Sequence, residues 1–298
     1  MTDPKMMEQI KNGQGFIAAL DQSGGSTPGA LRAYGVDEGA YSNDDQMFAA
    51  IHDMRSRIIT APSFTGDKVL GAILFEKTMD GQADGKPVPA LLRERGVVPF
   101  LKVDKGLEDE ADGVKLMKPM PDLDKLLARA KELGVFGTKM RSVIELANPV
   151  GIADIVKQQF AVAEQISRAG LMPIIEPEIS IKSSERAEAE AILLVELTKA
   201  LDALPEGRQV MLKLTLPTVA NRFAALVDHP GVARVVALSG GFTRAEACQE
   251  LARNRGVIAS FSRALLCDLR HQMSDDEFDR SLGRAIDEIY QASIAEAG

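Results

Sequence analysis

A lysine inside an apolar segment is the most reactive group that the sequence offers. Lys213 lies within Val210-Met211-Leu212-Lys213-Leu214-Thr215-Leu216. Burial disfavours the ammonium form, and a second cation nearby lowers a lysine pKa further, which leaves the free amine that attacks a carbonyl carbon. The alternative is a lysine at a strand edge whose charged end reaches out to solvent. The first interpretation predicts imine chemistry at Lys213.

Two further pairs of charged residues have the spacing of a β-strand. Lys139 and Arg141 are two residues apart, as are Glu176 and Glu178, and residues two apart on a strand share a face. Imine formation needs a carboxyl group that gives a proton to the departing hydroxyl and takes one from the attacking amine. If the strands meet, a lysine nucleophile, a second cation and a carboxylate pair converge.

A glycine pair marks a candidate site for an anion. Ser239-Gly240-Gly241 comes before a helix expected from Thr243, and such a turn offers backbone N–H groups to an anion. Arg263 could add a charge-assisted hydrogen bond. Most Gly-Gly pairs are only turns, and the position of this one at a strand end favours the anion. Asp21-Gln22-Ser23-Gly24-Gly25 could be another turn or a similar seat.

The elements that must position these residues are short apolar runs alternating with longer amphipathic segments. Runs of this kind, bounded by turn signals, are typical of strands buried on both faces. Eight are predicted, at 15–20, 69–75, 97–103, 135–139, 171–175, 210–214, 233–238 and 256–261. Helices are predicted at 122–133, 152–169, 184–204 and 243–253, with a helical lead-in at the N-terminus and a last helix from Asp275. This alternation predicts an α/β fold, a (β/α)8 TIM barrel, as a single domain over residues 1–298.

A polar or glycine-containing segment lies at or after the end of each of the eight runs. Strand ends are often polar because they emerge into solvent, but barrel active sites also lie at these ends. The eight ends together favour an active site there. Residues 81–92, rich in glycine and proline, predict a long loop after the second strand.

Composition excludes several classes of protein. The net charge of −8 argues against nucleic-acid binding, and three scattered histidines argue against a His-rich zinc site. Cys248 and Cys267 are expected to be buried thiols. No apolar stretch has the roughly 20 residues needed to span a bilayer, and the N-terminus lacks a secretory pattern. A cytoplasmic protein without membrane contact is therefore expected.

Seven motifs resemble, in order and spacing, the class I fructose-bisphosphate aldolases, and more closely their shorter bacterial branch. They are Leu20-Asp21-Gln22-Ser23, Lys102-Val103-Asp104-Lys105-Gly106, Lys139-Met140-Arg141, Ile175-Glu176-Pro177-Glu178-Ile179, Leu212-Lys213-Leu214, Leu238-Ser239-Gly240-Gly241 and Ser260-Phe261-Ser262-Arg263-Ala264-Leu265. The resemblance covers most of the chain. It implies reversible cleavage of fructose-1,6-bisphosphate to dihydroxyacetone phosphate and glyceraldehyde-3-phosphate through a lysine Schiff base, in glycolysis and gluconeogenesis.

The resemblance also implies roles for single residues. Lys213 would form the Schiff base, Glu176 would transfer protons during imine formation, and Asp21 would help to remove the C4 hydroxyl proton. Lys139 would polarise and position the substrate, with Glu178 as a supporting carboxylate.

Two phosphate sites follow in the same way. Lys105 and Arg141 look like partners of the distal phosphate. The seat of the other phosphate and nearby hydroxyls would be formed by Ser23, Ser239, Gly240, Gly241 and Arg263. A sugar phosphate is thus the expected partner, no cofactor or metal is expected, and a homo-oligomer is left open.

The sequence departs from this family at three places. Met140 stands where animal enzymes have tryptophan, and Ser262 stands where a glycine usually precedes the last arginine. The mobile C-terminal tyrosine of the animal enzymes has no counterpart in Ala295-Glu296-Ala297-Gly298, and Tyr290 is expected to pack in the core or on the surface. The residue that protonates the enamine is therefore not identified.

Two rival functions are compatible with the same residues. One is a different lysine-dependent barrel aldolase, or a transaldolase, acting on a monophosphorylated sugar. Two separate anion sites argue against it. The other is a barrel that binds sugar phosphates or partner proteins without catalysis, for which loss of the lysine or its carboxylate would be the sign; both are present.

Overall fold

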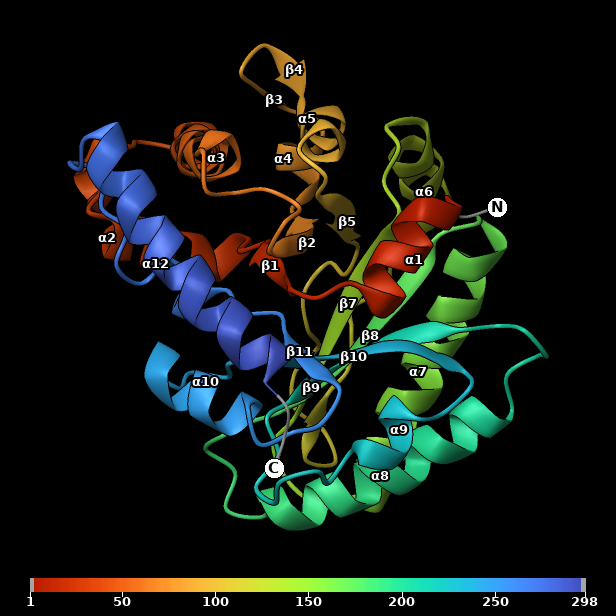
Figure 1. Ribbon diagram of the computed structural model, residues 1–298. Coiled ribbons are helices and arrows are strands. Elements are labelled where there is room, and N and C mark those ends of the chain that lie inside the picture. The colour runs from red at the N-terminus through yellow and green to blue at the C-terminus, as the bar shows by residue number, and fades with distance from the viewer. Residues whose placement is uncertain (1–2, 296–298) are drawn as a thin grey trace.

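Eight parallel strands form the central barrel of the computed structural model, which describes residues 3–295 (Figure 1). In sheet order they are β1 (Phe16–Leu20), β2 (Val69–Leu74), β5 (Val98–Lys102), β7 (Gly137–Ile144), β8 (Met172–Ile179), β9 (Val210–Thr215), β10 (Val232–Leu238) and β11 (Val257–Ala259). Every neighbouring pair in this order is parallel. The Ala19 N–H donates to the Phe261 carbonyl across 3.1 Å and brings the first strand to the last. The predicted (β/α)8 barrel is confirmed.

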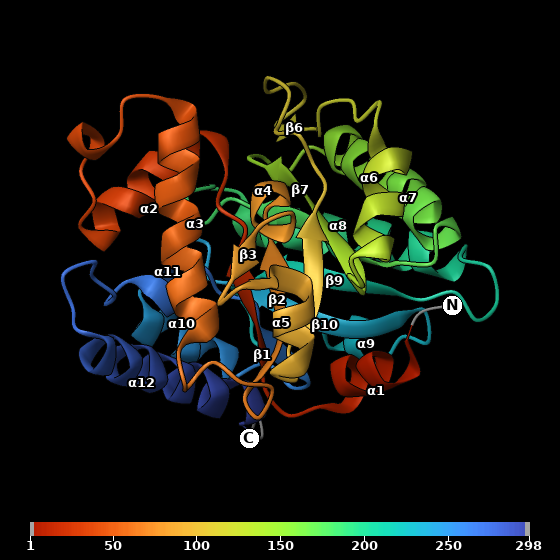
Figure 2. The ribbon, with the colours of Figure 1, turned by 90° about the horizontal axis from the view of Figure 1, so that it is seen from above.

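Helices surround the strands, as the view from above in Figure 2 shows. They are α1 (Pro4–Asn12), α2 (Thr27–Tyr34), α3 (Asp44–Thr60), α4 (Glu76–Met79), α5 (Val88–Glu94), α6 (Leu123–Glu132), α7 (Pro149–Arg168), α8 (Arg186–Asp202), α9 (Ala224–Val227), α10 (Arg244–Leu251), α11 (Arg263–Leu266) and α12 (Asp275–Ile294). Two short 3-10 turns, η1 (Gly24–Ser26) and η2 (Glu38–Ala40), flank α2. The strand β6 (Val114–Lys115) pairs antiparallel with β7. Within residues 3–295 no helix combines the length and apolar character that crossing a membrane requires.

Alternate residues of the strands form two separate apolar cores. In β1, Phe16, Ala18 and Leu20 pack between strands and helices, whereas Ile17 and Ala19 belong to a second cluster with side chains from the other strands. Side chains alternate across a strand, so the second cluster fills the interior of the barrel. Ile10 of α1 joins this inner cluster, and α1 therefore closes the N-terminal end of the barrel.

The predicted loop over residues 81–92 is wrong. The segment holds a short hairpin of β3 (Gln82–Ala83) and β4 (Lys86–Pro87), followed directly by α5. Asp84 and Gly85 have φ values of 50° and 69°, the left-handed conformation that a tight hairpin turn requires. Pro89 lies in the first turn of α5, where its missing N–H costs nothing. The glycine and proline therefore mark a turn and a helix start.

Two expectations on single residues have different outcomes. Cys267 is exposed and Cys248 is half-buried, so the expectation of two buried thiols is wrong. Tyr290 is half-buried and packs against the outer core, with the Lys68 ammonium 5.7 Å from its ring centroid. Its expected packing role is confirmed, whereas Glu296, Ala297 and Gly298 lie outside the described residues.

A buried carboxylate of α8 holds the loop that follows β9. Glu190 is fully buried and accepts hydrogen bonds from the Thr218 backbone N–H at 2.9 Å and from the Thr218 hydroxyl at 2.7 Å. Arg186, one turn earlier, lies 3.3 Å from the same carboxylate and also donates to the Leu216 carbonyl. This pair fixes the chain just beyond the strand that carries Lys213.

We expect Glu190→Ala to lower the free energy of unfolding by about 3 kcal/mol, because it removes a fully buried carboxylate that holds the Thr218 N–H and hydroxyl and the Arg186 guanidinium. Urea denaturation measures this loss. The control is Glu196→Ala on the same helix, which removes only a surface pair with Lys199 and should cost less than about 1 kcal/mol. Equal losses in the two variants would contradict this role of Glu190.

Candidate active site

The strand alternation that fills the barrel interior also places its charged groups. Ile17 and Ala19 point inward in β1, so Asp21 is the next inward residue at the end of that strand. Met172 and Ile174 precede Glu176 in the same way on β8, and Met211 precedes Lys213 on β9. The inward face is thus apolar toward the N-terminal ends of the strands and charged at their C-terminal ends.

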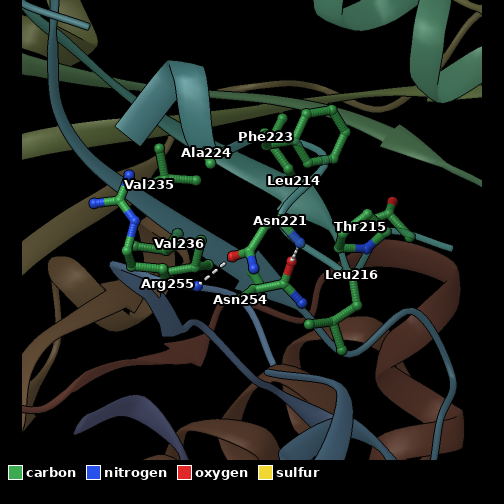
Figure 3. Close-up of a pocket in the computed structure, with 13 residues that line it drawn as sticks. Leu214, Thr215, Leu216, Asn221, Phe223, Ala224, Val235, Val236, Asn254 and Arg255 are labelled. Carbon is green, nitrogen blue, oxygen red and sulfur yellow. Dashed lines mark hydrogen bonds between the residues drawn. The ribbon is translucent and has the colours of Figure 1, made fainter. Parts of the chain in front are cut away.

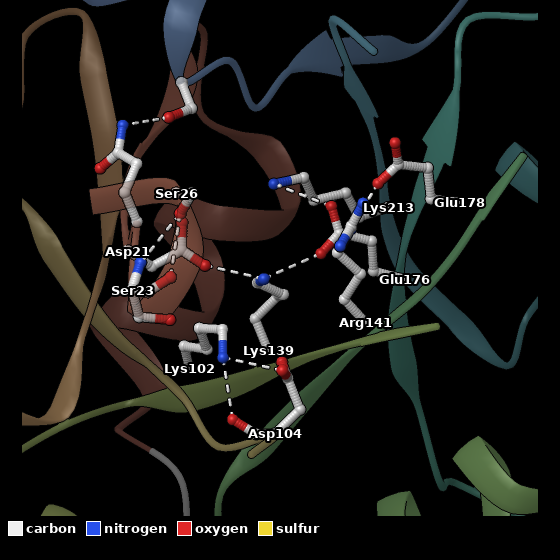
Figure 4. A network of polar contacts seen from close by, with 12 residues as sticks. Asp21, Ser23, Ser26, Lys102, Asp104, Lys139, Arg141, Glu176, Glu178 and Lys213 are labelled. Carbon is white, nitrogen blue, oxygen red and sulfur yellow. Dashed lines mark hydrogen bonds and ion pairs between the residues drawn. The ribbon is translucent and has the colours of Figure 1, made fainter. Parts of the chain in front are cut away.

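Lys139 lies at the centre of this charged layer (Figure 4). Its Nζ is 2.7 Å from Asp21 Oδ2 and 3.0 Å from Glu176 Oε2. The other oxygen of Glu176 is 3.2 Å from Lys213 Nζ. All four side chains are buried, with between 3% and 7% of each residue exposed. Two lysines and two carboxylates therefore form one buried chain of ion pairs, in which Asp21 stands beside Glu176 in place of the expected Glu178.

The balance of charges in this chain fixes the protonation of two of its members. Burial raises the pKa of Asp21, but attraction to Lys139 and Lys213 outweighs it and holds that pKa well below its usual range. Burial lowers the pKa of Lys139, but Asp21 and Glu176 outweigh this and raise it well above its usual range. Asp21 is thus a carboxylate and Lys139 an ammonium at neutral pH.

The two buried lysines differ in their contacts. Lys139 bridges two carboxylates, whereas Lys213 has only the Glu176 contact, at 3.2 Å, among the ion pairs of the described residues. A lysine held as an ammonium by two carboxylates cannot be the nucleophile. Lys213 is the better placed of the two for attack on a carbonyl carbon.

Neutral side chains hold the carboxylate strand in place. The Glu176 backbone N–H donates to Gln159 Oε1 at 2.9 Å, and Gln159 Nε2 donates to Ser142 Oγ at 3.0 Å. The Thr215 hydroxyl accepts from the Ile179 N–H and donates to the Ile179 carbonyl, both at 2.9 Å. These contacts join α7, β7, β8 and β9 around the ion pairs and reduce their freedom to move.

A third lysine and a third carboxylate lie at and just beyond the end of β5. Lys102 Nζ is 2.7 Å from Asp104 Oδ1 and donates to the Asp104 carbonyl at 2.8 Å. Lys102 is not among the site residues predicted from the sequence. Its signal is the strand period, because Val98 and Phe100 point inward and Lys102 is the next residue on that face.

Arg141 and Glu178 form a further ion pair in this layer. Arg141 Nε is 2.5 Å from Glu178 Oε2. Burial lowers the pKa of the Arg141 guanidinium, but Glu178 outweighs this effect and raises it above its usual value. Glu178 thus orients Arg141, which is compatible with the supporting role expected of this carboxylate.

These side chains line a cavity of about 680 Å³ at the mouth of the barrel. Of the predicted site residues, the cavity lining includes Asp21, Ser23, Lys139, Arg141, Glu176, Glu178, Lys213, Ser239, Gly240 and Arg263. The loop from Asp21 is a turn, in which the Ser26 hydroxyl bonds the Ser23 carbonyl at 3.0 Å, and Ser23 and Ser26 both face the cavity. This volume is within the range that small-molecule sites occupy.

Two predicted residues are not part of that lining. Lys105 lies on the outside, 2.6 Å from Glu76, in a separate surface hollow with Arg129. Gly241 is exposed and follows the lining residue Gly240, and a Cβ added to it would be 3.5 Å from an Arg263 guanidinium nitrogen. The structure thus brings together ten of the twelve predicted residues.

Polar atoms at the wall leave capacity for a ligand. Ser260 Oγ and Asp104 Oδ2 are buried and have no hydrogen-bond partner among residues 3–295. Buried polar atoms are normally paired, so a water molecule or a polar ligand would satisfy these two. Within the same residues, no group of three or more His, Cys, Asp or Glu side chains is placed to hold a metal ion.

A second, much smaller hollow carries no such chemistry (Figure 3). It lies beside β9, β10 and α9 and has a volume of about 10 Å³. Its polar wall is satisfied internally, since the Asn221 N–H donates to Asn254 Oδ1 at 2.9 Å and the Arg255 N–H donates to Asn221 Oδ1 at 2.8 Å. A space of this size holds about one water molecule.

Comparison with known proteins gives one family match. The family model for fructose-bisphosphate aldolase class-I matches residues 5–219. The matched range contains Asp21, Lys139, Glu176 and Lys213, whereas the Ser239–Gly241 turn and Arg263 lie beyond it.

Solved structures share the fold. A fructose-bisphosphate aldolase from Plasmodium falciparum, in complex with TRAP and a small-molecule inhibitor, has a TM-score of 0.80 at 20% identity, over 99% of this chain and 95% of that chain. A protein of Corynebacterium glutamicum, a structural genomics target, has a TM-score of 0.58 at 16% identity, over 98% and 92% of the two chains. At these identities the likeness establishes the fold alone.

We expect Lys139→Met to lower the free energy of unfolding at pH 7 by roughly 3–5 kcal/mol, because two buried carboxylates lose their shared cation. Since the pKa of Asp21 is lowered in the folded wild type, its contribution is present above the ordinary aspartate pKa of 3.8 and is lost as the pH falls further. The deficit of the variant should therefore stay constant down to about pH 4 and shrink as the pH falls below it.

Urea titrations at several pH values measure this difference. Lys125→Met is the control, since it removes only an exposed pair with Asp122. A Lys139→Met deficit that is as small as that of the control, or that stays constant as the pH falls below about 4, would reject the proposed balance of charges.

Proposed function

Because the chain belongs to the class I fructose-bisphosphate aldolases, we propose that it cleaves fructose-1,6-bisphosphate reversibly through an imine on Lys213. Membership of this family makes the protein a lyase. The observation that carries the proposal is the position of Lys213 Nζ, buried and 3.2 Å from Glu176 Oε1, beside a second lysine that two carboxylates hold as an ammonium. The products are dihydroxyacetone phosphate and glyceraldehyde-3-phosphate.

The first half of the reaction forms the electron sink. Glu176, a carboxylate at rest, relays two protons in turn from the Lys213 ammonium to the C2 oxygen. After the first transfer, the free Lys213 Nζ attacks C2, and after the second the C2 oxygen leaves as water. The product is a protonated imine. The Lys139 ammonium stabilises the negative charge that develops on the C2 oxygen during attack.

The second half breaks the carbon–carbon bond. Asp21, held as a carboxylate, accepts the C4 hydroxyl proton while the C3–C4 bonding electrons move into the imine to give an enamine. Glyceraldehyde-3-phosphate departs. Protonation at C3 and hydrolysis of the imine release dihydroxyacetone phosphate and free Lys213. No metal or other cofactor takes part in this route.

The phosphates are assigned from the charges around the cavity. Ser23, Ser239, Gly240 and Arg263 support a seat for one phosphate, with Gly241 shaping the turn behind it. Arg141 is the predicted partner of the distal phosphate, and Lys102 lines the same cavity. Lys105 can join only after leaving Glu76.

We place this reaction in glycolysis and gluconeogenesis, in the cytoplasm. Residues 1–298 are proposed to act as one barrel domain, with a sugar phosphate as substrate and without nucleic-acid partners. A homo-oligomer is compatible with this proposal.

Borohydride should trap the imine. In the presence of dihydroxyacetone phosphate, we expect reduction to inactivate the wild type irreversibly and to add the mass of the reduced triose phosphate once per chain. Lys213→Ala should take up no adduct and lose at least about 1000-fold in kcat, because no other amine can take its place. EDTA should leave wild-type activity unchanged. An adduct on Lys213→Ala, or inhibition by EDTA, would overturn the imine route.

Assays with fructose-1,6-bisphosphate and fructose-1-phosphate test which of Arg141 and Lys105 binds the distal phosphate. Arg141→Met should raise KM for fructose-1,6-bisphosphate about tenfold, the effect of one lost charge-assisted hydrogen bond, and change KM for fructose-1-phosphate little. Lys105→Met tests the sequence-based assignment: a similar selective rise supports it, and an unchanged KM removes it. If Arg141→Met affects both ketoses equally, the distal assignment of Arg141 is wrong.

A further inference from the structure

We infer that Ser262 is an anion-binding residue of this site and that Gln22 and Arg55 are the residues that aim its hydroxyl. Gln22 Nε2 donates to Ser262 Oγ across 2.5 Å, between segments 240 residues apart in the sequence. Both residues line the active-site cavity. This inference deepens the proposed function and rests on it for the identity of the ligand, a phosphorylated ketose.

Arg55, Gln22 and Ser262 form a chain of hydrogen bonds, here called the relay, and Arg55 is its fixed end. It lies on α3, is fully buried and is the largest of the fully buried side chains of the described residues. One guanidinium nitrogen donates to Thr78 Oγ1 at 2.9 Å, and another donates to the backbone carbonyl of Gln22. The turn after β1, which carries Asp21 and Gln22, is thereby tied to the outer layer of the barrel.

The guanidinium also sets the orientation of the Gln22 amide. Gln22 Oε1 lies 3.5 Å from the Arg55 nitrogen that holds the Gln22 carbonyl. A flipped amide would direct its NH2 group at a cation, which is electrostatically unfavourable. Arg55 therefore directs Gln22 Nε2, a donor without acceptor capacity, toward Ser262.

This orientation decides what Ser262 can offer to a ligand. A serine hydroxyl has one O–H donor and two acceptor lone pairs. Because Gln22 donates to Ser262, it takes up a lone pair and leaves the O–H free to donate elsewhere.

The position of the Ser262 hydroxyl suits a phosphate group of the ligand. Ser262 is half-buried, shares the cavity wall with Ser239 and Gly240, and directly precedes Arg263. An O–H donor and a guanidinium that line one cavity suit a phosphate oxygen, which only accepts hydrogen bonds. The ligand group that we propose is the C1 phosphate of the ketose, at the Ser239–Gly240 turn.

The test uses Ser262→Ala, Gln22→Ala and the double variant, assayed with fructose-1,6-bisphosphate, fructose-1-phosphate and inorganic phosphate as inhibitor. Loss of one hydrogen bond to a charged group should raise KM and the phosphate inhibition constant about tenfold in Ser262→Ala, with kcat within about twofold. Both ketoses should show this effect, because both carry the C1 phosphate. Ser262→Thr keeps the hydroxyl and should behave like the wild type.

The double variant tests the relay itself. Gln22→Ala should raise KM less than Ser262→Ala does, and it should add nothing in the Ser262→Ala background, because its effect passes through that hydroxyl. Gln22→Glu should be worse than Gln22→Ala, since a carboxylate would accept the Ser262 hydrogen and repel the phosphate. Ser42→Ala, at an exposed serine outside the cavity, should leave KM and kcat unchanged.

The outcomes separate this inference from the proposed function. If the wild type neither cleaves the ketoses nor traps the triose phosphate, the proposed function fails, and calorimetric binding of inorganic phosphate still compares the variants. If the wild type is active but Ser262→Ala keeps wild-type KM and phosphate inhibition, Ser262 is not an anion ligand. Independent, additive effects of Gln22→Ala and Ser262→Ala would overturn the relay.

Discussion

The structure of the barrel mouth depends on one buried ammonium that neutralises two buried carboxylates. Lys139 lies 2.7 Å from Asp21 and 3.0 Å from Glu176, and all three are withdrawn from water. Burying a charge without a partner costs several kcal/mol, so β1, β7 and β8 must meet in one register for any of the three charges to be tolerated. The same arrangement commits Lys139 to the role of a fixed cation. Lys213, with Glu176 beside it, is then left as the amine that we propose for covalent chemistry.

The sequence predicts the barrel because its strands are buried on both faces and its helices are amphipathic. Strand ends were harder to predict. β7 continues to Ile144 and β8 to Ile179, five and four residues beyond the expected ends at Lys139 and Ile175, and the two remain paired over that length. Charged residues usually mark the end of a buried strand, but in a barrel mouth they face a polar cavity while pairing continues. α2 and α3 lie outside the predicted helices, and the 81–92 segment misled because glycine and proline also mark hairpins and helix starts.

Some residues of the candidate site could likewise be predicted from the sequence, and others could not. Groups brought together by strand alternation, such as Glu176 and Lys213, follow from spacing that the sequence displays. Lys102 and Lys105 are only three residues apart. Lys102 is the last inward-facing residue of β5 and pairs with Asp104, whereas Lys105 follows the strand and pairs with Glu76 on the outside. A choice between them requires the register of β5, which residue types alone do not give. The hydrogen bond from Gln22 to Ser262 joins the segments that follow β1 and β11, and no local sequence pattern predicts it.

Exchange of the C2 oxygen with solvent measures directly whether an imine forms on Lys213. An imine on Lys213 replaces the carbonyl oxygen of dihydroxyacetone phosphate by nitrogen and returns an oxygen from solvent on hydrolysis. In ¹⁸O-labelled water, we expect the wild type to label C2 faster than the spontaneous rate and Lys213→Ala not to do so. Labelling by the wild type at the spontaneous rate, during active cleavage of fructose-1,6-bisphosphate, would mean that the reaction does not pass through an imine on Lys213.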